Sequence, residues 1–257
     1  MVTICRYGEI FLKGQNKGKF EHALVLSLKK KLASHNIHPK INMLHNRIIV
    51  ENDESHYLQT VCGLTSVSRA VQVPIEMDAI IKTAFQLLPK QFSSFKVHAR
   101  RITKTGRYNS TQLNETVGEA IFETLNVPVH MKNPEVMVGI EIVNDSAYIF
   151  TEKLPCPGGL PEGVSGVITI PSTDPHAELA GLLLLKRGCS IVFTGKHAFP
   201  IFDSYTTESA ETPIACARGT LSIVRTLYNL PELYPLIGMT EEDVKLNLNH
   251  FKSLVKP

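Results

Sequence analysis

Positively charged side chains gather in two stretches of the chain, and the chemistry they could perform is the binding of a polyanion. Residues 1–50 carry nine Lys and Arg side chains against two acids, a local balance of +7. Residues 90–107 carry six more and no acid, whereas residues 155–257 hold eight basic and ten acidic side chains. The net charge of +3 for all 257 residues conceals this asymmetry. We therefore expect residues 1–154 to bind a polyanionic partner.

The candidate contacts with that partner are Lys and Arg side chains of the N-terminal half. They are Arg6, Lys13, Lys17, Lys19, Arg47, Lys96, Arg100, Arg101, Lys104, Arg107 and Lys132. Side chains alternate between the two faces of a strand, so we expect only one of Arg100 and Arg101 to contact a ligand directly. His98 shares the face of Lys96 and Arg100. The alternative reading is an ordinary solvated basic surface, which is the more typical explanation for a run such as Lys29–Lys31 alone.

Cysteines, histidines and serines give no argument for catalysis or metal binding. The cysteines are scattered, contain no CxxC pair and are predicted to be small buried hydrophobic residues. They are Cys5, Cys62, Cys156, Cys189 and Cys216. The ten histidines lack a paired spacing such as HxxxH. Ser172 has no base identifiable in the sequence, so we expect no catalytic residue and no metal site.

The elements that must position the basic residues fall into an α/β fold with an α+β N-terminal half. A strand at residues 2–7 precedes a helix from Lys17 to Ser34, whose Phe20, Leu24, Leu28 and Leu32 recur every fourth residue. Short strands flank the turn dipeptide His45-Asn46. A helix at 56–61 and a strand at 66–73 complete a β-α-β-β-α-β order, the ferredoxin-like motif. This first predicted domain covers residues 1–74.

The pattern restarts after Pro74 and predicts a second α/β domain over residues 75–154. Its helices are expected at 77–88 and behind the capping candidates Ser110 and Thr111, where Leu113, Val117, Ile121 and Leu125 stand four apart. Its strands are expected at 95–101, 136–143 and 146–153. Residues 155–166 form a linker dense in Pro and Gly. A strand, helix and strand at 167–170, 174–186 and 190–193 then begin a parallel sheet in a third domain, residues 167–257.

Several separate motifs resemble one family, the tRNA 4-thiouridine synthetases or tRNA sulfurtransferases. The N-terminal Arg-Tyr-Gly-Glu-Ile-Phe-Leu-Lys-Gly at 6–14 is similar to that family's opening motif. Residues 95–101, 132–136 and 148–153 resemble its THUMP domain, and residues 158–166 resemble its interdomain linker. The resemblance implies a ferredoxin-like domain and a THUMP domain that hold a tRNA, with the THUMP domain on the 3′ acceptor end. It makes the basic residues named above candidate RNA contacts.

The third domain departs from the family at its nucleotide-binding loop. Active members carry a PP-loop, Ser-Gly-Gly-x-Asp-Ser, whose glycines let backbone N–H groups approach the pyrophosphate of ATP. Aligned on residues 182–188, the loop here reads Ser172, Thr173, Asp174, Pro175, His176 and Ala177. Side chains replace both glycines, Asp174 brings a carboxylate to the phosphate position, and Pro175 removes a donor. We therefore expect a vestigial loop and no cofactor, although the family uses ATP and Mg²⁺.

The rest of this domain is expected to be a shortened Rossmann-like, adenine nucleotide alpha hydrolase-like domain. Residues 202–205 lead almost directly into 206–209, which resembles the family's Thr-Gly-Glu-Ser segment. Residues 230–239 resemble its Leu-Pro-x-Leu-x-Pro-Leu-Ile-Gly-Met run. The family's sulfur-relay cysteine would fall after Pro257, and neither Cys189 nor Cys216 has its context. We therefore expect neither adenylation nor sulfur transfer by this chain alone.

Three functions fit these residues. The first is a non-catalytic tRNA-binding protein of the sulfurtransferase lineage. The second is the tRNA-presenting component of a modification enzyme, in which a stand-alone PP-loop protein or a sulfur carrier supplies the missing chemistry. The third is a structural role in which the third domain forms a homodimer contact, although the leucine run at 182–185 is more typical of a core. No window approaches the roughly 18 apolar residues of a membrane span, so we expect a cytoplasmic protein without a membrane partner.

Overall fold

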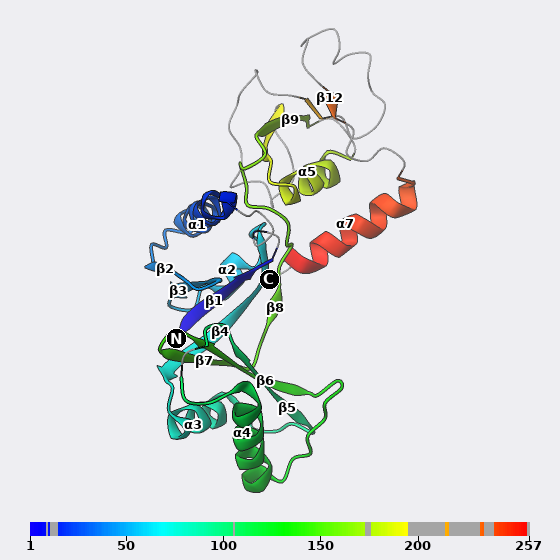
Figure 1. Ribbon diagram of the computed structural model, residues 1–257. Helices are drawn as coiled ribbons and strands as arrows, with labels where there is room; N and C mark the ends of the chain where they lie inside the picture. The colour runs from blue at the N-terminus through cyan, green and yellow to red at the C-terminus, as the bar shows by residue number, and fades with distance from the viewer. Residues whose placement is uncertain are drawn as a thin grey trace. The chain divides into compact units, whose positions relative to one another are not determined.

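The computed structural model describes residues 1–8, 10, 15–104, 106–172, 176–194, 214–215, 232–233 and 239–255 (Figure 1). The chain forms two compact units. The first comprises residues 1–6, 39–55 and 66–154, and the second comprises residues 7–38, 56–65 and 155–257. Each unit therefore collects segments that are far apart in the sequence.

The first six elements follow the ferredoxin-like order that the sequence predicts. They are β1 (Val2–Tyr7), α1 (Lys17–Ala33), β2 (Ile41–Leu44), β3 (Arg47–Glu51), α2 (Ser55–Leu58) and β4 (Leu64–Pro74). β3 pairs antiparallel with both β1 and β2. The β2–β3 turn contains Asn46 at φ +56, a left-handed conformation that asparagine tolerates better than most residues. The predicted turn dipeptide His45-Asn46 therefore joins these two strands.

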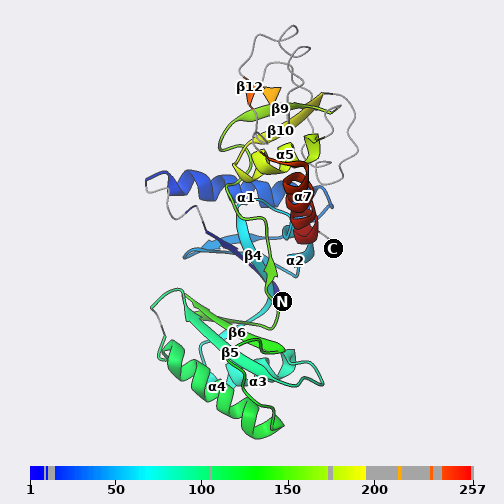
Figure 2. The same ribbon diagram turned by 90° about the vertical axis from the view of Figure 1, so that its right-hand side faces the viewer.

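The second group of elements extends the same sheet. These elements are α3 (Met77–Leu87), β5 (Phe95–Arg101), α4 (Ser110–Leu125), β6 (Val136–Val143), β7 (Ser146–Phe150) and β8 (Leu154–Pro155). The strand order is β2-β3-β1-β4-β7-β6-β5, with β8 paired to β4. β5 runs parallel to β6, and β6 runs antiparallel to β7. Helices α3 and α4 cover one face of β5, β6 and β7, as both views show (Figures 1 and 2).

Helix α4 begins one residue earlier than the capping candidates predict. Its N-cap is Asn109, whose side chain accepts a hydrogen bond from the Gln112 backbone while the Gln112 side chain accepts from the Asn109 backbone. This reciprocal pair is a capping box, so Ser110 is already helical. Leu113, Val117 and Ile121 are buried as predicted, but Leu125 is 41% exposed because the helix ends there. The buried face is therefore one turn shorter than the sequence pattern.

The second unit contains α1 and a parallel sheet with its own core. The sheet order is β10-β9-β11-β12, and its strands and helices are β9 (Val167–Pro171), α5 (Ala177–Lys186), β10 (Ser190–Thr194), β11 (Ile214–Ala215), β12 (Glu232–Leu233) and α7 (Glu241–Val255). β9 pairs parallel with β10, as predicted. Leu182, Leu184 and Leu185 are buried in this core, so the leucine run faces inward.

Helix α7 was not predicted, although its start carries a recognisable signal. Thr240 and Asp243 bond reciprocally, with the Asp243 carboxylate accepting from Thr240 and the Thr240 hydroxyl accepting from the Asp243 backbone. This is a capping arrangement of the S/T-x-x-D/E type, followed by a helix with three acids in its first turn. Over the described part of the chain, no helix is both long enough and apolar enough to cross a membrane.

Candidate anion-binding site

A buried carboxylate lies between two buried arginines in the first unit. Glu141 is the one acid of the apolar strand β6. Its Oε1 accepts a hydrogen bond from Arg6 Nε at 2.7 Å, and its Oε2 accepts from Arg47 Nε at 2.6 Å. Burial alone would raise the pKa of Glu141, but the charges of Arg6 and Arg47 and their hydrogen bonds hold it below its ordinary value. Glu141 is therefore ionised, and two arginines share one negative charge.

Phe150 on β7 supports the Arg6 side chain. The guanidinium carbon of Arg6 lies 4.6 Å from the centre of the Phe150 ring, within cation–π range. Arg6 Nη1 also donates a hydrogen bond to Ser68 Oγ at 2.9 Å. Across the β6–β7 pairing, Phe150 faces Gly139, and a Cβ at that position would overlap the ring. Gly139 therefore leaves the space that the ring needs to hold Arg6.

A pocket of about 210 Å³ opens beside this buried cluster. Its walls come from β5, β6 and the end of β7 with the residues that follow. They are Lys96, His98, Arg100, Met137, Glu141, Phe150 and Lys153. The alternation of β5 explains the first three, because residues 96, 98 and 100 share one face while Phe95, Val97 and Ala99 are buried on the other. The pocket therefore lies on the sheet face opposite to α3 and α4.

Two titratable groups of the pocket, His98 and Lys153, have lowered pKa values. Burial lowers the pKa of His98, and the charges of Arg100, Lys96 and Lys153 lower it further. Its imidazole is therefore neutral at pH 7, and His98 Nε2 accepts a hydrogen bond from Arg100 Nε at 2.9 Å. Burial also lowers the pKa of Lys153, with Arg6 and Arg100 adding to the effect. Both shifts have the sign that crowded positive charges produce.

This arrangement can bind an anion. Arg6, Arg47, Lys96, Arg100 and Lys153 place five cationic groups around the single carboxylate of Glu141. The two buried arginines bond Glu141, whereas Lys96, Arg100 and Lys153 line the pocket, with Lys96 Nζ also donating to the Met131 carbonyl at 3.3 Å. A phosphate oxygen in the pocket would relieve their mutual repulsion and accept charge-assisted hydrogen bonds. The candidate ligand is therefore a phosphate or a similar oxyanion.

The structure separates the candidate RNA contacts into groups. Lys96 and Arg100 line the pocket, and the expectation that His98 shares their face is confirmed. Arg101 is half-buried on the opposite face of β5, as the alternation predicts. Arg6 and Arg47 are only 4% and 8% exposed, so they support the pocket through Glu141 and have little surface for a direct contact.

The other candidates do not line the pocket. Lys104, Arg107 and Lys132 are exposed on the loops before α4 and after it. Lys17 and Lys19 begin α1 in the second unit, where Lys17 pairs with Glu21 at 3.5 Å. Lys13, another candidate RNA contact, lies outside the described residues. So do Thr173, Asp174 and Pro175 of the loop before α5. Their assignment stays a prediction.

Sequence reasoning did not single out four residues of the pocket: Met137, Glu141, Phe150 and Lys153. A signal was present for Glu141, because a single acid in an otherwise apolar strand needs a buried cation. Lys153 lies within the segment at 148–153 that carries the family resemblance. Phe150 had no signal of its own, since its role depends on the glycine that lies across the strand pair.

The start of α5 offers a phosphate fewer favourable contacts than the pocket does. The hydroxyl of Ser172 donates to the backbone carbonyl of Thr194, so it is engaged within the sheet. The first turn of α5 carries the acid Glu178, and its N-cap His176 lies 3.5 Å from Glu241. Two carboxylates near a helix N-terminus oppose a bound polyphosphate. Glu178 and Glu241 therefore bring negative charge to the start of α5.

The four described cysteines are buried and form no disulfide with one another. They are Cys5, Cys62, Cys156 and Cys189. Burial raises the pKa of Cys62 to about 12, and it also raises the pKa of Cys189. Thiols in this state are poor nucleophiles, which agrees with the packing role predicted from the sequence. Cys216 and the segments at 202–209, 230–231 and 234–238 lie outside the described residues.

Metal binding finds no support in the same part of the chain. Among the residues that the structure describes, no group of three or more His, Cys, Asp or Glu side chains could hold a metal ion. The candidate site is therefore built from cationic side chains rather than from metal ligands.

Comparisons with known proteins place two parts of the chain in described families. Residues 2–68 match the ThiI ferredoxin-like domain, and residues 75–152 match the THUMP domain. The pocket residues Lys96, His98, Arg100, Met137, Glu141 and Phe150 all lie within the THUMP match. Arg6 and Arg47 come from the ferredoxin-like match. The cluster therefore joins side chains of both domains within the first compact unit.

Several relatives of the chain carry the name probable tRNA sulfurtransferase. A probable tRNA sulfurtransferase of Methanocaldococcus jannaschii is 34% identical over 75% of this chain and 55% of its own length. One of Natranaerobius thermophilus is 33% identical over 81% of this chain and 54% of its own length. The chain thus spans about half the length of the curated relatives that it matches.

Solved structures agree with this relationship. The crystal structure of PH1313 from Pyrococcus horikoshii covers 98% of this chain and 99% of its own, with a TM-score of 0.81 and 29% identity. The crystal structure of a 4-thiouridine synthetase–RNA complex with bound ATP covers 75% of this chain and 52% of its own, with a TM-score of 0.62 and 27% identity. The chain therefore carries a ThiI-type ferredoxin-like domain and a THUMP domain and is a homologue of the tRNA sulfurtransferases.

Proposed function

We propose that this chain binds tRNA, holding the acceptor end through its ferredoxin-like and THUMP domains, and does not itself adenylate or thiolate the RNA. The observation that carries the proposal is the pocket lined by Lys96, Arg100 and Lys153, beside a buried carboxylate that is already paired with Arg6 and Arg47. The relatives named tRNA sulfurtransferase support the choice of tRNA among polyanions. So does the similarity to a 4-thiouridine synthetase in complex with RNA.

The pocket would act as a phosphate clamp rather than as a reader of base sequence. Lys96, Arg100 and Lys153 present charged donors to a space that admits one phosphate group. Phosphate contacts fix the register of a nucleic acid and carry little sequence information. Glu141 would keep the clamp rigid by holding Arg6 and Arg47, whose charges also contribute to its potential.

The absence of adenylation is proposed from the loop before α5. The sequence puts Thr173 and Asp174 where active members have glycines. The Ser172 hydroxyl is bonded to Thr194, and Glu178 lies in the first turn of the helix. Each of these features disfavours a bound polyphosphate. We expect titration with ATP to give no binding that survives physiological salt.

The experiment that tests tRNA binding compares two charge-neutralising variants. Arg100→Gln removes a cation from the pocket, whereas Lys82→Gln removes an exposed cation from α3 that does not line it. Fluorescence anisotropy with labelled bulk tRNA should show roughly a three- to tenfold loss of affinity for Arg100→Gln. Lys82→Gln should bind nearly as the wild type does. Equal losses for both variants, or no binding by the wild type, would overturn the proposal.

A further inference from the structure

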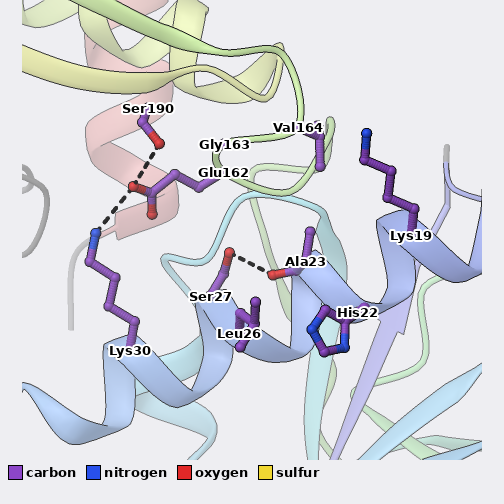
Figure 3. A pocket seen from close by; sticks show the side chains of 10 residues that line it. All are labelled: Lys19, His22, Ala23, Leu26, Ser27, Lys30, Glu162, Gly163, Val164 and Ser190. Atoms are coloured by element: carbon purple, nitrogen blue, oxygen red, sulfur yellow. Dashed lines mark hydrogen bonds and ion pairs between the residues drawn. The ribbon is translucent and has the colours of Figure 1, made fainter.

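A second hollow in the molecule is not used by the proposed phosphate clamp. In the second unit, a groove of about 570 Å³ runs between α1 and the turn that precedes β9 (Figure 3). The helix side is formed by Lys19, His22, Ala23, Leu26, Ser27 and Lys30. The other side is formed by Glu162, Gly163, Val164 and Ser190. Its volume lies in the range of small-ligand sites.

The helix side of the groove is an exposed stripe of α1. Residues 19, 22, 26 and 30 recur at helical spacing, on a different face from the buried Leu24, Leu28 and Leu32. Leu26 is 52% exposed, so its side chain offers apolar surface to the groove. The stripe therefore combines an open apolar floor with basic ends.

The two ends of the groove differ in charge. At one end, Lys30 Nζ lies 3.2 Å from Glu162 Oε1, which also accepts a hydrogen bond from Ser190 Oγ at 3.3 Å. At the other end lies Lys19, which has no salt-bridge partner among the described residues (Figure 3). Eleven helical residues separate Lys19 from Lys30, or about 16 Å along the axis. The groove therefore offers a cation at one end and a paired carboxylate at the other.

The wall opposite the helix is preformed. The Leu160 N–H donates to the Lys186 carbonyl at 2.9 Å, and the Ser165 N–H donates to the Gly188 carbonyl at 2.9 Å. Ser165 Oγ also donates to the Arg187 carbonyl at 2.8 Å. These bonds fix the turn that carries Glu162 and Val164 against the end of α5. A ligand would therefore meet a rigid wall and lose little binding energy to ordering it.

We propose that this groove binds one unpaired nucleotide of the RNA. The proposal rests on the proposed tRNA binding and assigns a second contact to it. Lys19 would hold the phosphate, and Leu26 and Val164 would contact the face of the base. Both contacts to Glu162 use Oε1, so its Oε2 can accept a hydrogen bond from a base N–H. Because Glu162 is paired with Lys30, its charge repels the phosphate less than a bare carboxylate would.

The test uses the full chain with matched variants and a short RNA probe. A 5′-phosphorylated trinucleotide should shift the methyl NMR signals of Leu26 and Val164 while leaving Leu246, an exposed leucine of α7, unmoved. Lys19→Gln should weaken trinucleotide binding about fivefold, since it removes one phosphate contact. Lys29→Gln removes the same charge from an exposed position of α1 that lies ten residues further along the helix and does not line the groove, and it should have little effect.

The outcomes separate this proposal from the proposed function. If the Leu26 and Val164 signals do not move, or if Lys19→Gln and Lys29→Gln weaken binding equally, the groove assignment is wrong whatever the affinity for tRNA. If a short acidic peptide moves these signals at lower concentration than the trinucleotide does, the groove is a protein-docking site and the assignment is also wrong. Loss of tRNA binding in Arg100→Gln with normal trinucleotide shifts would support both sites as separate contacts.

Discussion

Two regions of the molecule can be compared as places for a phosphate, and they are built in opposite ways. The pocket on β5, β6 and β7 is lined by three cationic side chains and one carboxylate, Glu141, which two buried arginines already neutralise. The start of α5, which the sequence motifs lead us to expect at the position of the family's ATP loop, carries Glu178 in its first turn and has His176 close to Glu241. The helix dipole favours an anion there, but side-chain charge opposes it.

Backbone geometry alone does not make an anion site. The strand-helix-strand arrangement of β9, α5 and β10 is retained, with β9 and β10 parallel. The pocket, by contrast, lies on a sheet face without any helix N-terminus and depends on side chains whose charges are fixed by a buried network. Changes to that network should therefore have larger effects than changes near α5.

The largest expected effect follows from Glu141→Gln. This variant leaves Arg6 and Arg47 buried without their carboxylate, which costs about 3 to 5 kcal/mol for a buried ion pair. Urea unfolding should show that loss in the free energy of unfolding. The matched control is Glu119→Gln on the exposed face of α4, which should change the free energy by less than about 0.5 kcal/mol. Equal stability of the two variants would show that the network is not needed for folding.

The lowered pKa of Glu141 predicts how the free energy of unfolding depends on pH. The pKa of Glu141 is lowered in the folded protein, so its contribution is fully present above the pKa of an unfolded glutamate. That contribution is lost as the pH falls through the depressed folded value. Urea unfolding between pH 7 and pH 3 should therefore show wild-type stability falling more steeply on the acid side than that of Glu141→Gln. Parallel curves would mean that another group is responsible.

A smaller effect is expected for Gly139→Ala. The added Cβ would overlap the Phe150 ring and displace the support of Arg6, at a cost of about 1 to 3 kcal/mol for overpacking. Gly118→Ala is the control, because a Cβ there has ordinary contact with Val97 and alanine favours a helix. Thermal unfolding should show a lower Tm for Gly139→Ala and an unchanged or higher Tm for Gly118→Ala. An unchanged Tm in Gly139→Ala would show that the ring can move freely.

Trimming the RNA tests which part of it is recognised. If the acceptor end is held, the single-stranded 3′ end offers base edges and faces that a duplex does not. Removing it should weaken binding to the wild type by roughly tenfold, or about 1.4 kcal/mol. Competition between intact and trimmed tRNA would measure this directly. Equal affinities would mean that the protein binds RNA only through nonspecific electrostatic contacts.

The smallest expected effect is that of ATP. Pyrophosphate release in the presence of tRNA should stay at background, and mass analysis should find no thiouridine in the product RNA. Restoring Ser-Gly-Gly-x-Asp-Ser at residues 172–177 should not produce activity, because the described cysteines are buried. Stoichiometric adenylation by the unmodified chain would show that the reading of this loop is wrong.

Much of the fold could be predicted because its signals are local. The spacing of Leu24, Leu28 and Leu32 marks α1, and the alternation from Phe95 to Arg101 marks β5 and the face of Lys96 and Arg100. The ferredoxin-like order follows from such patterns read along the chain. The start of α4 was placed one residue late, because Asn109 competes with Ser110 and Thr111 as a cap and only the Gln112 partner decides between them.

The pocket itself depends on contacts that no local pattern contains. Arg47 and Arg6 meet Glu141 across 94 and 135 residues of sequence. From the sequence, the arginines at 6, 47 and 100 are all candidates for RNA contact. Only the tertiary structure shows that two of them are buried supports and that Arg100 faces the pocket. Long-range pairing of buried charges therefore decides which basic residues remain available to a ligand.

The most direct test of the central claim is the salt dependence of tRNA affinity. The slope of log affinity against log salt should fall in magnitude by about 0.7 to 0.9 in the double variant Lys96→Gln/Arg100→Gln, since the pocket holds one phosphate and each phosphate contact contributes about 0.7 for single-stranded and about 0.9 for duplex nucleic acid. The double variant Lys82→Gln/Lys90→Gln, which removes equal charge from exposed positions outside the pocket, should keep the wild-type slope. Equal slopes for both double variants would contradict a phosphate clamp at this site.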